Sequence, residues 1–343
     1  MSESFDCIII GAGLAGLTTA RYLQSAGLDI LVIESDDRPG GRVKSDYVDG
    51  YTLDHGFQVI NRGYPHVKNS RLLDHLNFTP ILEGFLPFRV SGGAKSPSSI
   101  ASSFLKGVFL TDPKSVPFHV RRAIYKSFLT GKPGFVDGGV SAFSNAYAEP
   151  ISNIHYSESV RKISGDLIDT DHSRYSARNI VIATDPLQAR EFIPSLGNIT
   201  MHSSTTWYHV PSERLQSAGK FTVVQGKNLI NSFAISDRVP SYAPIGKQLF
   251  SSTALGRVPE SNIRAELADI WGVEAGKWEL IAHYDIVNSL PEHPKTKKLF
   301  SESEISQGLY IAGDHRGFPS QQGAMESGKR AALKIIEREL QAR

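Results

Sequence analysis

The feature that most constrains this chain is a glycine-rich turn near its beginning. An apolar run at 6–10 leads into the sequence GAGLAG at 11–16, and apolar residues then recur at helical spacing over 14–26. A second apolar run at 30–33 ends on Glu34. This order predicts a buried strand, a tight turn, a helix and a second strand parallel to the first.

Each part of this pattern suits the binding of a dinucleotide. Gly11 allows the tight turn, Gly13 lets a pyrophosphate approach the backbone, and Gly16 lets helix and strand pack closely. The positive helix N-terminus attracts phosphates. Glu34 is placed to bind ribose hydroxyls, and its charge would repel a 2′-phosphate, which argues against a phosphorylated nicotinamide. A glycine-rich turn without a ligand is the alternative.

A second glycine element, RPGGRVKS at 38–45, follows Glu34 directly. Its two glycines bring the backbone close to a ligand, and Arg42 can pair with a phosphate. With these residues the sequence resembles the flavin-containing amine oxidase superfamily, which includes protoporphyrinogen oxidases, phytoene desaturases and renalase-like proteins. In that superfamily a G-G-R segment follows the ribose-binding acid and serves FAD. The resemblance therefore implies FAD as the cofactor.

Three further segments carry the resemblance. A D-x-G stretch at 54–56 matches one that runs under the flavin ring in the family, although a glycine bulge in a sheet is the alternative. The family's equivalent of Val160 bonds the adenine through its backbone. The G-D pair at 313–314 matches the segment that holds the ribityl chain and pyrophosphate, and the helix that begins at 323–328 points its N-terminus at the flavin in the family.

The resemblance implies a set of FAD contacts spread along the chain. They are Gly11, Gly13, Leu14, Ala15, Gly16, Glu34, Ser35, Gly41, Arg42, Gly56, Phe57, Gln58, Val160, Gly313, Asp314, Gly323, Ala324 and Met325. The single cysteine, Cys7, lies in the first predicted strand, far in sequence from the C-terminal motif. A cysteinyl link to the flavin at that motif is therefore impossible, and we expect FAD to be bound non-covalently.

The fold class implied is α/β, with a Rossmann-like FAD-binding domain of the glutathione-reductase and amine-oxidase type that is discontinuous in sequence. We assign 1–75, 134–190 and 291–343 to that domain, and 76–133 and 191–290 to an α+β substrate domain. A length of 343 residues is comfortable for two domains. Alternating runs predict a mainly antiparallel sheet in the second domain, and they lie at 205–210, 221–225, 229–235, 248–253 and 278–287.

The sequence does not identify catalytic residues. It shows no nucleophile-and-base spacing and no metal-ligand pattern, so we expect no metal. Gln58, Tyr208 and His283 are pocket candidates, although sheet packing explains Tyr208 and His283 better than contact with a substrate does. The resemblance implies an FAD-dependent oxidoreductase in which a hydride from a C–N or C–C bond passes to flavin N5, and oxygen or another acceptor reoxidises the flavin. A flavin-binding protein without turnover and an NAD-dependent dehydrogenase are the alternatives.

Charge and hydropathy limit the expected partners. A net charge of +2 gives no reason to expect nucleic acid binding, and we expect a small-molecule substrate, possibly apolar. No apolar run approaches the roughly 20 residues needed to span a membrane, so we expect a cytoplasmic location. Residues 94–135 hold seven basic residues against one acid, Asp112. The two apolar and basic helices expected within 100–129 could lie peripherally on an anionic membrane. Two helices of the substrate domain with solvated lysines are the alternative.

Overall fold

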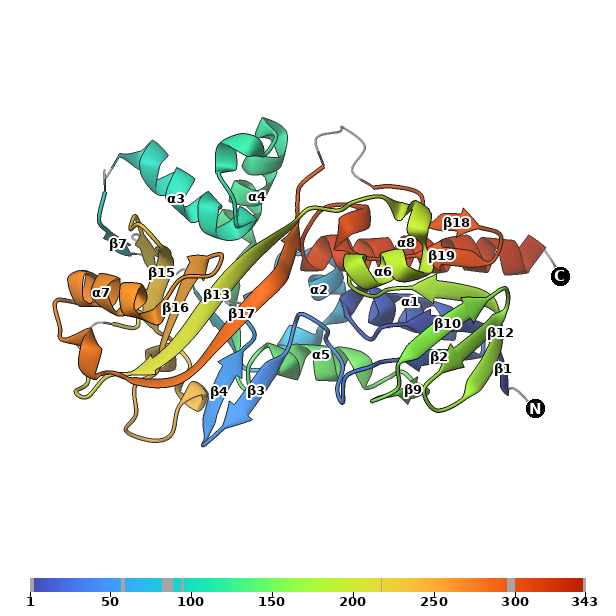
Figure 1. Cartoon of the computed structure of the whole chain (residues 1–343), viewed down its shortest axis with the longest axis horizontal. Helices are drawn as coiled ribbons and strands as arrows, with labels where there is room; N and C mark the ends of the chain where they lie inside the picture. The colour runs from blue at the N-terminus through green and yellow to red at the C-terminus, as the bar shows by residue number, and fades with distance from the viewer. Residues whose placement is uncertain are drawn as a thin grey trace. The chain divides into compact units, whose positions relative to one another are not determined.

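The computed structural model describes residues 3–56, 59–81, 89–93, 96–216, 218–294 and 300–341. The chain divides into two compact units, each discontinuous in sequence (Figure 1). Unit 1 comprises Met1–Lys44, Ser144–Thr200 and Pro291–Arg343, and unit 2 comprises Ser45–Phe143 and Met201–Leu290. Unit 2 thus includes 45–75 and 134–143, which were predicted to belong to the FAD-binding domain, and unit 1 includes 191–200, which was predicted to belong to the substrate domain. The roles assigned to the two domains remain predictions.

Unit 1 is built on an eight-stranded sheet. Its main path runs β10-β11-β12-β1-β2-β9, and β19 pairs with both β12 and β18. The pairs β12–β1, β1–β2, β2–β9 and β12–β19 are parallel, as the buried apolar runs predicted. The strands span Glu3–Ile10 (β1), Ile30–Ile33 (β2), Ile154–His155 (β9), Val160–Ser164 (β10), Leu167–Thr170 (β11), Arg174–Ile182 (β12), Glu304–Ser306 (β18) and Leu309–Ile311 (β19).

Two helices of unit 1 approach each other closely at a glycine. These are α1 (Leu14–Ser25), which follows the glycine-rich turn, and α8 (Gln321–Gln341), the last helix of the chain. A Cβ added at Gly328 would lie 2.2 Å from the carbonyl oxygen of Ala15, and the hydroxyl of Thr19 donates to the carbonyl of Gly328 at 3.1 Å. This close approach fixes α8 relative to the turn. A shorter helix, α6, spans Pro186–Phe192.

Unit 2 is built on a six-stranded sheet in the order β17-β13-β16-β15-β14-β7. The pairs β13–β16, β16–β15 and β15–β14 are antiparallel, which confirms the predicted antiparallel runs, whereas β14–β7 is parallel. The strands are Arg89–Ser91 (β7), Met201–Val210 (β13), Thr222–Val224 (β14), Leu229–Ala234 (β15), Phe250–Leu255 (β16) and Glu279–Pro291 (β17).

Different helices cover the two faces of this sheet. Helix α7 (Glu260–Trp271) buries Ile263 and Leu267 on one face, in a cluster with Trp207. On the opposite face Tyr208 belongs to a second cluster, against which Phe104 of α3 packs. Successive strand residues point to opposite faces, which explains why neighbours on β13 serve different clusters. Helices α3 (Pro97–Phe109) and α4 (Phe118–Gly131) confirm the two helices expected in 100–129.

Smaller elements complete the chain. A hairpin joins β3 (Ser45–Val48) to β4 (Tyr51–Asp54), and a three-stranded sheet has the order β5-β8-β6. The remaining strands and helices are β5 (Ile60–Asn61), β6 (Phe78–Pro80), β8 (Pro133–Val136), α2 (Pro65–Ser70) and α5 (Val140–Ala148), and α5 crosses the boundary between the units.

Candidate cofactor site

The turn after β1 is tightly packed at two of its glycines and open at the third. Gly11 has φ +104°, and its N–H donates to the carbonyl of Ile33 at 2.8 Å. A Cβ at Gly16 would lie 1.9 Å from the carbonyl oxygen of Gly11, so this position cannot carry a side chain. A Cβ at Gly13, in contrast, would meet no protein atom within 4 Å. The space in front of Gly13 is therefore available to a ligand.

Glu34 closes the turn from the end of β2. Its carboxylate accepts hydrogen bonds from the Ala12 N–H at 2.6 Å, the Asp36 N–H at 2.8 Å and the exposed Ser35 hydroxyl at 3.2 Å. A carboxylate has about four acceptor sites, so capacity remains for a ribose hydroxyl. Glu34 thus orders the turn and can still bind a ligand.

The second glycine element lies directly against the first. Gly40 forms a parallel bridge with Gly13, and its N–H donates to the carbonyl of Ala12 at 2.9 Å. Gly41 has φ +58°, and a Cβ there would lie 3.3 Å from the Cα of Gly13. The segment GGR is therefore held beside the open position of the turn by backbone contacts.

Arg42 connects this element to the C-terminal segment. Its guanidinium forms an ion pair with the buried Asp314 at 2.6 Å. Burial alone would lower the pKa of Arg42, but the Asp314 carboxylate holds it above its usual value. The Arg42–Asp314 pair therefore brings together two predicted contacts that lie at opposite ends of the sequence.

The C-terminal segment is anchored on α8. The Gly313 N–H donates to the hydroxyl of Ser327 at 3.1 Å, and the Gly323 N–H donates to the hydroxyl of Ser320 at 3.0 Å. A Cβ at Gly323 would lie 1.7 Å from the carbonyl oxygen of Phe318, so the start of the helix depends on this glycine. Ala324 is half-buried and Met325 fully buried beside it.

His315 is a residue of this segment that the sequence analysis missed. Both of its ring nitrogens are buried, and neither has a hydrogen-bond partner among the described residues. Burial lowers the pKa of the imidazole to about 4, so the ring is neutral at pH 7. A Cβ at Gly313 would lie 2.4 Å from the ring. The sequence feature that could have identified it is its position immediately after the G-D pair at 313–314.

The remaining predicted FAD contacts are spread over several elements of both units. Leu14 and Ala15 are buried in the first turn of α1, and Val160 lies half-buried at the start of β10, where it pairs with Thr170. Gly56 belongs to unit 2 and has φ +89°. Phe57 and Gln58 lie outside the described residues. The structure thus brings the predicted contacts of 11–42 and 313–325 together, and the contacts at 56–58 remain predictions.

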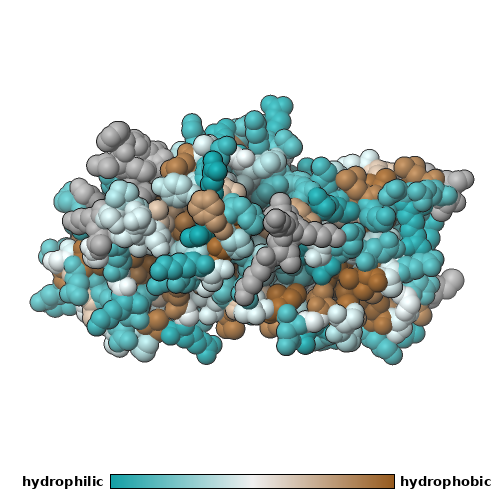
Figure 2. Space-filling view, turned by 90° about the horizontal axis from the view of Figure 1, so that it is seen from above, coloured by the Kyte–Doolittle hydropathy of each residue, from teal (hydrophilic) through white to brown (hydrophobic). Residues whose placement is uncertain are grey.

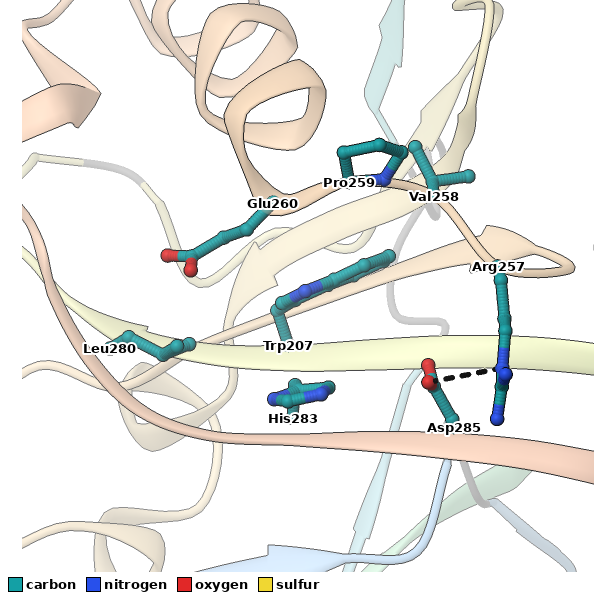
Figure 3. A pocket seen from close by; sticks show the side chains of 8 residues that line it. All are labelled: Trp207, Arg257, Val258, Pro259, Glu260, Leu280, His283 and Asp285. Carbon is teal, nitrogen blue, oxygen red and sulfur yellow. Dashed lines mark ion pairs between the residues drawn. The ribbon is translucent and has the colours of Figure 1, made fainter.

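Tyr208 and His283, the other pocket candidates, are separated by the sheet of unit 2. Tyr208 is buried and donates its hydroxyl to the carbonyl of Asp54 at 2.9 Å. His283 is exposed and lines an open groove of about 410 Å³ with Trp207, on the face covered by α7 (Figure 3). In the same groove Arg257 pairs with Asp285 at 3.3 Å. The two candidates therefore do not contribute to one pocket of unit 2.

Asp54 is the centre of a buried polar network that the sequence did not predict. Its carboxylate accepts hydrogen bonds from the Ser45 hydroxyl at 2.6 Å, the Val140 N–H at 3.0 Å and the Tyr242 hydroxyl at 2.8 Å. Burial raises the pKa of Asp54 to about 6, although the three donors oppose that shift. This network ties β4 to the first residue of α5.

The described part of the chain lacks two further features. It contains no group of three or more histidine, cysteine or acidic residues able to hold a metal ion. None of its helices is both long enough and apolar enough to cross a membrane.

Comparison with known proteins identifies the family. A model of the family described as flavin containing amine oxidoreductase matches residues 14–80 and 73–336, which together cover most of the chain. The chain belongs to this family. The fold class and the superfamily resemblance read from the glycine motifs are thereby confirmed.

Several characterised proteins resemble this chain in short segments of sequence. An L-amino acid dehydrogenase from Synechocystis sp. is 47% identical over 60 residues, which is 17% of this chain and 13% of the relative. A 15-cis-phytoene desaturase from Narcissus pseudonarcissus is 37% identical over 68 residues, which is 20% of this chain and 12% of the relative. The matched segments thus span less than a fifth of these relatives.

A solved structure extends the likeness of fold over the whole chain. An oxidoreductase from Methanosarcina mazei superposes with a TM-score of 0.71 at 17% identity, covering 96% of this chain and 99% of that one. At this identity the likeness shows the fold alone.

The cofactor of the family, FAD, fits the residues of unit 1. The space in front of Gly13 is open, and two glycine segments present backbone there. Glu34 retains acceptor capacity, and the His315 nitrogens are buried without a protein partner. FAD is the cofactor of this chain. The absence of a cysteine other than Cys7 leaves the C-terminal segment no thiol for a covalent link.

Proposed function

We propose that this protein is an FAD-dependent oxidoreductase that removes a hydride from an organic substrate. The observation that carries the proposal is the assembly of 11–16, 40–42 and 313–325 around the open position at Gly13. The family match over 14–336 supports the same conclusion. When bound, FAD supplies the electron acceptor for oxidation of a C–N or C–C bond.

The residues of unit 1 have defined tasks in this proposal. The glycines allow the pyrophosphate to approach the backbone, and the N-terminus of α1 stabilises its charge. Glu34 accepts hydrogen bonds from the ribose hydroxyls. The neutral His315 can donate from one ring nitrogen and accept at the other, and we propose that it contacts the cofactor. Its location beside Gly313 supports this role.

The face of unit 2 that contains Tyr208 supports an amine among the possible substrates. Asn231 lies on that face, because it pairs with Thr253 while Tyr208 pairs with Ser251, two residues along β16. The side-chain oxygen of Asn231 is buried and has no hydrogen-bond partner among the described residues. A buried acceptor without a partner is costly, and an N–H of a bound amine would satisfy it. Larger apolar substrates, such as carotenoid or porphyrinogen precursors, remain the competing class.

The test is an anaerobic titration of the purified holoprotein followed by the flavin absorbance. Amines, porphyrinogen and carotenoid precursors, and nicotinamides are added separately. Bleaching by one donor class supports the proposal and identifies its substrate chemistry. An amine substrate further predicts that Asn231→Leu raises KM more than it lowers kcat.

A second candidate function is flavin binding without turnover. It is favoured by the engagement of the Tyr208 hydroxyl with the Asp54 backbone and by the location of His283 on the other face of the sheet. With these contacts, neither Tyr208 nor His283 is positioned to act as a catalytic acid or base. Tightly bound FAD that no donor class bleaches would support this candidate and contradict the first. The acceptor that reoxidises the flavin and the cytoplasmic location remain predictions.

A further inference from the structure

Helix α4 of unit 2 has one buried face and one exposed apolar face. Val120 and Ile124 are buried. Phe118 is 71% exposed, Tyr125 37% and Leu129 55%, although all three are bulky and apolar. Their spacing of seven and four residues places them on one side of the helix, opposite the buried pair. Three large exposed apolar side chains on a single helix indicate an interaction surface.

Basic residues surround this apolar stripe. Arg122 and Lys126 are exposed on the same side of α4, and Lys132 and Lys114 are exposed near the two ends of the helix. The described residues provide no ion pair for any of these four cations. The only acid of 96–135 is Asp112, which accepts a hydrogen bond from the N–H of Lys114. The surface therefore combines exposed apolar groups with uncompensated positive charge.

The side of unit 2 that carries α3 and α4 is turned toward the viewer in Figure 2. Hydrophilic residues cover much of that side, and separate hydrophobic patches appear among them. This mixture differs from a purely solvated helix face, in which apolar groups are buried. It also differs from an apolar protein interface, whose central part is depleted in charge.

We propose that the exposed face of α4 docks the protein peripherally on an anionic lipid membrane. Phe118, Tyr125 and Leu129 enter the boundary between headgroups and acyl chains. Arg122 and Lys126, beside them, pair with lipid phosphates and carboxylates. Because the exposed cations of this surface attract negative charge, an anionic lipid surface is favoured over a neutral one. Docking through α4 does not depend on which substrate the flavin oxidises.

The test is sedimentation of the full-length holoprotein with lipid vesicles. Vesicles containing phosphatidylserine are compared with vesicles of phosphatidylcholine alone. We expect binding to the anionic vesicles to exceed binding to the neutral ones by about tenfold or more, and to fall when salt is raised from about 0.1 M to about 0.5 M. Equal binding to both vesicles, or binding to neither, overturns the proposal.

Matched variants assign the binding to α4. The pair Arg122→Glu and Lys126→Glu is compared with Lys227→Glu and Lys247→Glu, which change the charge equally at exposed positions elsewhere in unit 2. The pair Phe118→Ser and Leu129→Ser is compared with Leu333→Ser and Leu340→Ser, which are exposed on α8. We expect both α4 variants to lose at least tenfold in vesicle binding, and both control variants to retain it. Equal losses in the α4 and control variants overturn the assignment.

A spectroscopic probe reports insertion independently of the sedimented amount. Phe118→Trp places an indole on the exposed face, and we expect its fluorescence to shift to shorter wavelength on anionic vesicles and to be quenched by brominated acyl chains. No such difference from a Val287→Trp control, at another exposed apolar position, contradicts the proposal. The oligomeric state is measured in parallel. A dimer in solution that Phe118→Ser and Leu129→Ser dissociate would show that α4 binds a second copy instead.

Discussion

The glycine turn of unit 1 and the Asp54 network of unit 2 are both closely packed, but different groups of atoms hold them together. In the turn, the glycines at 11 and 16 pack against backbone atoms, and a Cβ at Gly16 has no room. Around Asp54, two side-chain hydroxyls, of Ser45 and Tyr242, join the Val140 N–H in donating to one carboxylate. The turn should therefore be sensitive to added atoms and the network to removed atoms.

This difference also separates stability from ligand binding within the turn. Gly16 faces protein, whereas Gly13 faces open space. A methyl group at the first position must move the backbone, and a methyl group at the second meets only what binds there.

The substitution Gly16→Ala should have the largest effect. Its Cβ would lie 1.9 Å from the Gly11 carbonyl, so α1 must move away from β1. We expect the free energy of unfolding to fall by about 3 kcal/mol or more, with loss of FAD binding. Denaturant unfolding measures the first effect and flavin absorbance the second. Wild-type stability in this variant would contradict the close packing.

Arg42→Met should have the next largest effect. It leaves the buried Asp314 carboxylate without its ion-pair partner. Since the Arg42 side chain is itself 35% exposed, we expect a loss of about 2–3 kcal/mol, below the full cost of a completely buried pair. The control is Lys44→Met, which breaks a pair with Asp36, whose side chain is 45% exposed, and should cost under about 1 kcal/mol. Equal losses in the two variants would contradict the structural importance of the Arg42 pair.

Asp54→Asn tests the network through its pH dependence. The pKa of Asp54 is raised to about 6 in the folded protein, so the fold favours the protonated acid. The contribution of this group to stability is therefore complete below its unfolded pKa of about 4 and is lost as the pH rises to about 6. Asparagine does not titrate.

We therefore expect the destabilisation caused by Asp54→Asn to be smaller at pH 7.5 than at pH 4.5, by on the order of 2 kcal/mol. Unfolding of both proteins at the two pH values measures this difference. A destabilisation that grows with pH would show that the three donors outweigh burial and lower the pKa of Asp54.

Tyr242→Phe should have the smallest effect. It removes one of three donors to Asp54 and keeps the buried ring. We expect a loss of about 1–2 kcal/mol, since the acceptor keeps its other two donors. The same measurement on Tyr51→Phe, which belongs to the same apolar cluster but donates to no described carboxylate, is the control. Equal losses of stability in the two variants would show that the hydrogen bond from Tyr242 to Asp54 does not stabilise the fold.

Much of the unit 1 site could be predicted from the sequence because it depends on local backbone requirements. A glycine marks a tight turn or a close backbone contact, and the structure shows such features at 11 and 16 and an open position at 13. The structure also places Glu34 at the turn, as expected. The apolar runs likewise predicted the parallel strands of unit 1. Arg42 and Asp314 are 272 positions apart, and although both were expected to contact FAD, their ion pair was not predicted.

The Asp54 network of unit 2 was harder to predict because its residues are distant in sequence. Asp54 and Tyr242 are 188 positions apart, and neither residue has a local pattern that names its partner. Alternation along β13 and β17 predicts two faces but not which face a helix will cover, so Tyr208 and His283 were grouped together. His315 was not predicted for a different reason, because it lies one position beyond the G-D pair and the pattern of that pair does not extend to it.

The measurement that tests the central claim most directly is the FAD content of the purified protein beside that of Gly13→Ala. We expect a yellow wild-type protein whose FAD is released by denaturant. We expect Gly13→Ala to be folded, with a stability change within about 1 kcal/mol for an alanine at the N-cap, but to bind FAD at least tenfold more weakly. A colourless wild-type protein that takes up no FAD, or equal affinity in the variant, would contradict the account.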